Sequence, residues 1–314
     1  EKSMKKLLVV LLVLCLATVA FATGAKEDSG TKTWNVSLIT MDSMDQHWVS
    51  CFEGAKDAAK ELGVTVTFDS PDTKDDNKQI EKINNAVAAG KDGILLAANA
   101  QDAPVAALKE AQAAGVKIMY VDSPANFDTL RLFATDNREG GKKIGERLLQ
   151  ELKAQSVTSG KIGIIGVNKA TESCNTREYG FRDAFEGQGY TLLETQYCDG
   201  DATRAKEIAD NYIAQGCVAV YGSNEGSTVG AGNAAKEALA AGIKVIACGS
   251  DASDTNKQLI KDGALLCIMG QNPYQMGYKG VYAMVDLLNG KDLGGYQYVE
   301  TGVNVIELSN VAQF

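Results

Sequence analysis

Residues 110–121 read EAQAAGVKIMYV, and residues 237–248 read EALAAGIKVIAC. Each stretch has the pattern of a helix end, a glycine that stops the helix and a β-rich run. Another similar pair, GAKDAAKELGV at 54–64 and GFRDAFEGQGY at 180–190, is separated by nearly the same number of residues. Because two independent matches share almost one offset, the sequence predicts two lobes of like topology, the second beginning near residue 137.

β-rich runs alternate with longer helical runs from residue 33 onward. The predicted strands cover 35–40, 64–68, 93–98, 117–121, 161–166, 191–198, 217–222, 243–249 and 264–270. Such alternation is typical of parallel sheets with helices on both faces. After a helix at 273–290, two short β runs at 296–301 and 303–308 can carry the chain back between the lobes.

The expected fold class is therefore α/β, with two doubly wound parallel-sheet lobes joined by a three-strand hinge. Lobe 1 is predicted to comprise 33–136 plus 273–301, and lobe 2 to comprise 137–272 plus 302–314. Three crossings between lobes would make a hinge rather than a loose linker.

The N-terminus has the pattern of an export signal. Within residues 1–22, Lys5 and Lys6 precede an almost wholly apolar run that ends in Ala20-Phe21-Ala22, a small-x-small cleavage pattern. Residues 1–3 precede Met4 and look extraneous. A retained membrane anchor is the alternative, although the run is short for a spanning helix, and no lipobox cysteine follows it. We expect a periplasmic or otherwise extracytoplasmic protein.

Charge and cysteine content exclude several classes of function. Loss of residues 1–22 removes Glu1 and three lysines, a net +2, which takes the net charge from −9 to about −11. Such an acidic chain repels phosphate backbones, so no nucleic-acid partner is expected. The six remaining cysteines show no CxxC pair and no Cys/His metal spacing. We expect buried free thiols; pairing of Cys174 with Cys198 is the alternative.

Polar side chains gather in the loops that follow the predicted strands, where open parallel sheets bind ligands. The candidates for substrate binding are Asp45, His47, Trp48, Asn99, Asp122, Asn175, Arg177, Asn224, Asp251 and Gln271. Carboxylates accept hydrogen bonds, arginine donates in a fork, amides do both, and a flat indole covers an apolar C–H face. This inventory suits a neutral, polyhydroxylated ligand, with Trp48 as the stacking platform.

The same residues also have structural explanations. Trp48, at the first turn of a helix, could be a packing residue, and a surface His47 needs no role. Asp122 or Asp251 could cap the segment that follows it. Arg177 could lie on the solvated face of a helix beginning near Thr176.

Several of these motifs resemble one family. NVSLITMDSMDQHWVSCFEGAKDAAKELG (35–63), ATDN (134–137), YGSNEG (221–226), GSDAS (249–253) and GQNPYQMGYKGV (270–281) resemble periplasmic sugar-binding proteins of the ribose/galactose-binding family, the substrate-binding components of ABC importers. The resemblance covers about 34–309. It implies a type I periplasmic binding protein fold and a monosaccharide held between two hinged lobes.

By motif position, the resemblance assigns Asp45, His47 and Trp48 to the first-loop contact with the sugar. It places Asp122, Asn224, Asp251 and Gln271 at positions that usually contact hydroxyls, whereas Asn99 matches only after a one-residue shift. Asn175 occupies the place of an arginine found in ribose-type relatives, with Arg177 two residues on, so either could reach the ligand. The loop around Gly200 lacks an aromatic of ribose-type proteins, which implies different stacking or a roomier pocket.

The expected function is that of a carbohydrate ABC importer's substrate-binding protein, a monomer with an inner-membrane permease as partner. The alternative is a sensor that presents a sugar-like signal to a chemoreceptor or sensor kinase. A transcriptional repressor would need a helix-turn-helix ahead of the core. An enzyme is not expected: GSTVGAG (226–232) lacks the Lys-Ser/Thr of a P-loop, a lone histidine cannot form a multi-histidine metal site, and no cofactor is implied.

Overall fold

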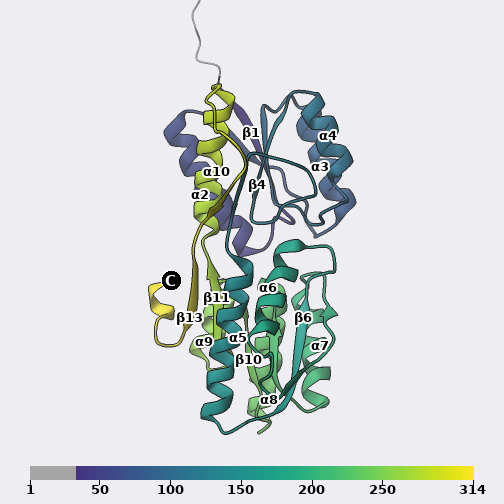
Figure 1. Cartoon of the computed structure of the whole chain (residues 1–314), viewed down its shortest axis with the longest axis vertical. Helices are drawn as coiled ribbons and strands as arrows, with labels where there is room; N and C mark the ends of the chain where they lie inside the picture. Colours follow the sequence, from purple (N-terminus) through teal and green to yellow (C-terminus); the bar gives the residue numbers. More distant parts are fainter. Residues whose placement is uncertain (1–32) are drawn as a thin grey trace, which may run out of the picture. The chain divides into compact units, whose positions relative to one another are not determined.

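The computed structural model describes residues 33–314 (Figure 1). The expected export signal at 1–22 lies outside these residues. None of the described helices combines the length and apolar character that crossing a bilayer requires. Within the same residues, no cluster of three or more His, Cys, Asp or Glu side chains could hold a metal ion.

The first sheet contains six parallel strands in the order β12-β5-β4-β3-β1-β2. Its strands are β1 (Asn35–Ile39), β2 (Thr65–Phe68), β3 (Gly93–Leu96), β4 (Lys117–Val121), β5 (Arg131–Ala134) and β12 (Gln297–Glu300). Its helices are α2 (Gln46–Leu62), α3 (Asp76–Ala88), α4 (Val105–Ala113) and α10 (Pro273–Leu288). We call these elements lobe 1; α2 and α10 cover one face of the sheet, and α3 and α4 cover the other (Figure 1).

Alternation within the strands explains the two covered faces. Val36 and Leu38 of β1 join the core under α2 and α10, whereas Ile39 joins the core under α3 and α4. Successive side chains of a strand point to opposite faces, so a strand buried on both sides is mostly apolar.

The second sheet has the order β13-β11-β10-β9-β6-β7, with β8 also paired to β6. Its strands are β6 (Gly160–Gly166), β7 (Tyr190–Leu192), β8 (Gln196–Tyr197), β9 (Cys217–Gly222), β10 (Ile246–Ser250), β11 (Cys267–Gln271) and β13 (Val303–Glu307), which alone runs antiparallel to its neighbour. Its helices are α5 (Asn137–Ala154), α6 (Glu172–Asp183), α7 (Ala202–Ala214), α8 (Glu225–Ala240) and α9 (Asp254–Lys261), with a final 3-10 turn at Val311–Gln313. We call these elements lobe 2.

Two details of the predicted elements were wrong. The strand expected over 191–198 is two short strands, β7 and β8, separated by three residues. The helix expected near Thr176 begins at Glu172.

The chain passes between the two sheets three times, after β5, after β11 and after β12. The first crossing leads into α5, the second into α10 and the third into β13. This is the three-strand hinge that the sequence predicted, and it gives the type I periplasmic binding protein fold.

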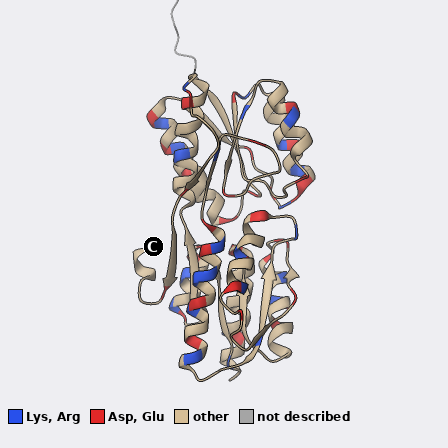
Figure 2. Ribbon diagram, viewed as in Figure 1, with Lys and Arg blue, Asp and Glu red and all other residues tan. Residues whose placement is uncertain are grey.

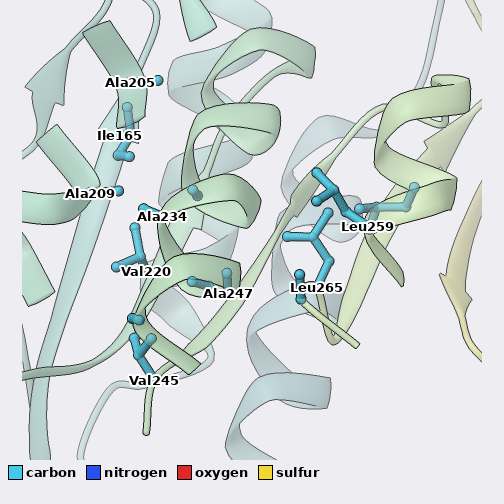
Figure 3. Packing of buried hydrophobic residues seen from close by; sticks show 14 of the residues in the cluster. Ile165, Ala205, Ala209, Val220, Ala234, Val245, Ala247, Leu259 and Leu265 are labelled. Atoms are coloured by element: carbon cyan, nitrogen blue, oxygen red, sulfur yellow. The ribbon is translucent and has the colours of Figure 1, made fainter. Parts of the chain in front are cut away.

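Apolar side chains fill the space between the lobe 2 sheet and the helices α7, α8 and α9. Ile165 and Val220 of the sheet pack with Ala234 of α8 and Ala209 of α7, and a neighbouring group includes Leu259 and Leu265 (Figure 3). Lys, Arg, Asp and Glu lie mainly on helices and loops, whereas the central strands carry almost none (Figure 2). All six described cysteines are buried and free, so the alternative pairing of Cys174 with Cys198 does not occur.

Candidate functional site

Asp122 and Asp251 occupy matching places, one directly after β4 of lobe 1 and the other directly after β10 of lobe 2. Both have left-handed backbone conformations, with φ of 60° and 72°. Such conformations are uncommon outside glycine and gather at functional sites. Neither residue caps a helix, since Ser253 caps α9 and Asp136 caps α5. The capping explanation for these aspartates is therefore wrong.

His47 lies between these two carboxylates, on the second residue of α2. Its Nε2 is 3.1 Å from Asp122 Oδ2, and its Nδ1 is 3.7 Å from Asp251 Oδ1. The ring thus joins a carboxylate of its own lobe to one of the other lobe. It is buried, so the expectation of an unconstrained surface histidine is wrong.

The electrostatics of this trio favour a protonated imidazole. Burial lowers the pKa of His47, but the hydrogen bond and charge of Asp122 and the charge of Asp251 outweigh it and raise the pKa above its usual value. Burial raises the pKa of Asp122, but the hydrogen bond and charge of His47, with the charge of Arg177, bring it below its usual value.

Trp48 has both packing and cavity contacts. The indole is buried in the apolar core under α2 and α10, and it also lines the cavity beside Asp122 and Asp251. His47 meets it edge-on, with ring centroids 4.6 Å apart. Within residues 33–314 the indole Nε1 has no hydrogen-bond partner, which leaves a buried donor beside the cavity.

Arg177 is buried in lobe 2 rather than solvated, so that alternative for Arg177 is wrong. Its guanidinium donates to Asn137 Oδ1 through Nη2 at 2.9 Å and to the carbonyl of Ser223 through Nη1 at 2.5 Å. Nη1 lies 3.8 Å from Asp251 Oδ2. These hydrogen bonds hold the guanidinium group in place, and Arg177 also lines the cavity.

In the side-chain amides of Asn224 and Gln271, one polar atom is hydrogen-bonded and the other has no partner among the described residues. Asn224 caps α8 by accepting from the Ser227 N–H at 3.0 Å, and its Nδ2 lacks a partner among the described residues. Gln271 donates to Asp251 Oδ1 at 2.5 Å, and its Oε1 likewise lacks one. Buried amides normally complete their hydrogen bonds, so a donor and an acceptor remain for another molecule.

Asn99 and Asn175 lie away from the cavity lining. Asn99 donates to Asp76, and its carbonyl accepts from Thr171 Oγ1 at 2.8 Å, a contact between the lobes. Asn175 donates to the carbonyl of Lys169 at 2.9 Å. Of the two residues that the sequence left open in this loop, Arg177 is the one that lines the cavity.

Lys74 is a cavity residue that the sequence analysis missed. It follows β2, its side chain is only 7% exposed, and its ammonium donates to Asp42 and, at 2.7 Å, to Asp45. From lobe 2, Gly200 lies directly against it: a Cβ at Gly200 would approach Lys74 Nζ to 2.9 Å. Lys74 therefore packs against the loop around Gly200, the loop that lacks the aromatic residue of ribose-type proteins.

The cavity is lined from both lobes. Its residues are Met41, Asp45, His47, Trp48, Lys74, Asp122, Val167, Ser173, Cys174, Arg177, Asn224, Asp251 and Gln271. Three aspartates face Lys74, Arg177 and a histidine whose pKa is raised, so the lining charges nearly balance. With an indole and unpaired amide groups, the chemistry of this lining suits an uncharged, hydroxyl-rich molecule. The cavity volume of about 20 Å³ in this arrangement is enough for only about one water molecule, so a larger ligand requires the lobes to lie further apart.

Comparisons with known proteins agree with this architecture. A ribose import binding protein of Haemophilus influenzae is 27% identical over 283 residues, covering 88% of this chain and 94% of that protein. A carbohydrate transporter solute binding protein from Agrobacterium radiobacter, solved with D-arabinose, is 29% identical with a TM-score of 0.84 over 90% of this chain and 97% of that one. An Agrobacterium vitis solute binding protein bound to α-D-tagatopyranose is 26% identical, with a TM-score of 0.83 over 90% of this chain and 99% of that one.

The family model described as a periplasmic binding protein domain matches residues 36–292, which is most of the chain. The matched region includes every strand of the two sheets except β12 and β13. The chain therefore belongs to the periplasmic binding protein family.

Proposed function

We propose that this protein is the extracytoplasmic substrate-binding protein of a carbohydrate ABC importer, and that it binds a monosaccharide or similar polyol between its lobes. The observation that carries the proposal is the cavity, in which an indole, three aspartates, an arginine and two half-paired amides converge from both lobes. The relatives named above are sugar-binding proteins of such importers. In this role the protein is a binding protein and not an enzyme.

Each side chain has a defined task in this proposal. The Trp48 indole covers an apolar C–H face of the sugar. Asp122 and Asp251 accept from hydroxyls, and Arg177 donates. Asn224 Nδ2 and Gln271 Oε1 supply a further donor and acceptor.

Contacts from both lobes give the ligand a preference for the form in which the lobes meet. A ligand shifts an equilibrium only by its differential affinity, and a sugar held by both lobes has such a preference. A permease that contacts both lobes could then distinguish loaded from empty protein; a chemoreceptor or sensor kinase would read the same change. We further propose that residues 1–22 direct export, that the protein is monomeric, and that 33–136 with 273–301 and 137–272 with 302–314 are its lobes.

A thermal-shift screen against pentoses, hexoses and polyols tests the proposal. A ligand that binds only the native protein stabilises it by about 2.7 kcal/mol at one hundred times its Kd, which raises the melting temperature by several degrees. Sugar acids and sugar phosphates serve as charged controls. No shift with any neutral sugar, or a shift with charged ones alone, would contradict the proposal.

A further inference from the structure

The first turn of α2 lacks a cap from its own lobe. Helix N-termini leave backbone N–H groups without partners inside the helix. Trp48 and Val49 donate to the carbonyl of Asp45, which leaves the N–H groups of Gln46 and His47. The Asp45 side chain stands at the capping position but makes no capping hydrogen bond, and its carboxylate accepts from Lys74.

The missing acceptor comes from lobe 2. Glu225, the first residue of α8, accepts from the His47 N–H through Oε2 at 3.3 Å. Its own helix is already capped, because Asn224 and Ser227 form a reciprocal capping box. The Glu225 carboxyl group is therefore not needed to cap its own helix and can accept a hydrogen bond from lobe 1.

The backbone that carries Glu225 is held closely. A Cβ at Gly226 would come within 1.8 Å of the carbonyl oxygen of Gly200, so the start of α8 is packed on the loop that also meets Lys74. The carboxyl group thus approaches α2 from a fixed position.

The Glu225 side chain lies near other carboxylates. Asp45, at the start of α2, and Asp251, in the loop after β10, are the nearest carboxylates, while Lys74 and Arg177 each pair with one of them. Burial, then Asp45 and Asp251, raise the pKa of Glu225 to about 7, against the lowering effect of the Gln46 and His47 N–H groups. Its ordinary value is 4.5.

We propose that Glu225 is a positioning residue that joins lobe 2 to the first turn of α2, and that the meeting of the lobes on a ligand is accompanied by protonation of this carboxyl group. The proposal rests on the function proposed above, since it concerns regulation of the same site. Protonated Glu225 still accepts from His47 through its carbonyl oxygen, while the repulsion from Asp45 and Asp251 disappears.

The sign of the pH effect follows from the raised pKa. Above about pH 7 the carboxyl group is ionised whether or not the lobes meet, and contributes no pH dependence. Between about pH 7 and 4.5 the joined form binds a proton that the separated form does not, so ligand affinity rises as the pH falls. One linked proton gives at most about a tenfold change in affinity per pH unit. His47 is a second titrating group: Asp251 of lobe 2 raises its pKa, whereas burial and Arg177 of the same lobe lower it, so the proton uptake that remains in Glu225→Gln measures its share.

The test is calorimetric titration of the full chain at pH 8, 7, 6 and 5, with the best sugar from the screen. Buffers of different ionisation enthalpy report the protons taken up on binding. For wild type we expect the affinity for sugar to rise several-fold to tenfold for each pH unit below pH 7. We also expect protons to be taken up on binding near pH 6. Glu225→Gln, which resembles the protonated acid, should bind at pH 8 at least as tightly as wild type and lose most of the uptake, leaving the share of His47. Glu225→Ala should bind more weakly throughout.

Glu237→Gln is the matched control, because Glu237 lies on the same helix with a 68% exposed side chain paired to Lys206. It should keep the wild-type pH profile. A Glu225→Gln profile identical to wild type, or no proton uptake by wild type, would overturn the inference.

A direct titration of Glu225 separates this inference from the proposed function. The ¹³C carboxyl resonance of Glu225 should titrate near its ordinary 4.5 in ligand-free protein whose lobes are separated, and near 7, as in the joined arrangement, at saturating sugar. If sugar binds and the midpoint does not rise, the inference is overturned while the proposed function stands. If no sugar binds, the proposed function fails first and the inference fails with it.

Discussion

Lys74 links the cavity to the stability of lobe 1. Burial lowers the pKa of its ammonium, but the charges of Asp45 and Asp42 outweigh that effect and raise it above its usual value. Removing one partner of a buried ion pair leaves the other charge without compensation. The lysine therefore holds two carboxylates at the entrance to α2.

Lys74→Met should lower the free energy of unfolding by about 3–5 kcal/mol, since Asp42 and Asp45 lose a buried cation. Urea denaturation measures the change. Lys56→Met is the control: Lys56 pairs with Glu53 at 2.7 Å, but both side chains are about half exposed, so the cost should stay within about 0.5 kcal/mol. Equal effects of the two substitutions would show that the Lys74 cluster is not a buried ion pair in solution.

Trp48→Ala should weaken sugar binding by about 1–3 kcal/mol, in line with buried aromatic anchors. Because Trp48 also packs in the core, stability falls too, so calorimetry is performed where the variant is folded. Phe52→Ala is the matched control on the same helix, since Phe52 stacks on Phe68 and does not line the cavity. If both variants bind as tightly as wild type, Trp48 is a packing residue only.

At this scale the sequence predicted the cavity well, for one physical reason. Parallel strands place their following loops at one edge, so polar residues after each strand converge, and eight of the ten candidates line the cavity. Asn99 and Asn175 lie in suitable loops, but their side chains bond locally to Asp76 and to the Lys169 carbonyl. Lys74 was missed because its partners Asp42 and Asp45 lie about thirty residues away in the sequence, so no local pattern connects them.

Helix contacts in both lobes depend on glycines where two backbones meet. A Cβ at Gly277 of α10 would lie 1.9 Å from the carbonyl oxygen of Cys51 on α2, and a Cβ at Gly54 of α2 would lie 2.0 Å from that of Tyr274. In lobe 2, the backbones of α5 and α6 approach each other equally closely at Gly141 and Gly180. Side chains at these positions would force the helices apart.

Gly277→Ala should destabilise the protein by about 1–3 kcal/mol, because overpacking exceeds the gain in helix propensity. Urea or thermal unfolding measures it. Gly295→Ala is the control, since nothing lies within 4 Å of a Cβ there, and its effect should be small. A stabilised Gly277→Ala variant would contradict the close helix contact.

Element boundaries show where pattern reasoning failed. The run at 191–198 alternates like a strand, yet Tyr190–Leu192 and Gln196–Tyr197 pair with β6 as separate pieces. The run lies at the sheet edge, where pairing is not enforced from both sides. Central strands such as β3 and β9 were predicted closely because both of their faces are buried.

Besides the three hinge segments, contacts across the cavity connect the two lobes. Within residues 34–314 these include Thr171 with Asn99, His47 with Asp251 and Glu225 with the first turn of α2. To move from mostly separated to mostly joined lobes, from 1:99 to 99:1, a ligand must favour the joined form by about 5.5 kcal/mol. Several charge-assisted hydrogen bonds and one stacked ring can supply this preference.

A crystal structure grown with the best sugar from the screen tests the central claim most directly. The account predicts one sugar in the cavity, with a face against Trp48 and hydroxyls on Asp122 of lobe 1 and Asp251 and Arg177 of lobe 2. An empty cavity at saturating sugar, or a sugar bound elsewhere with Trp48 in contact only with the core, would contradict it.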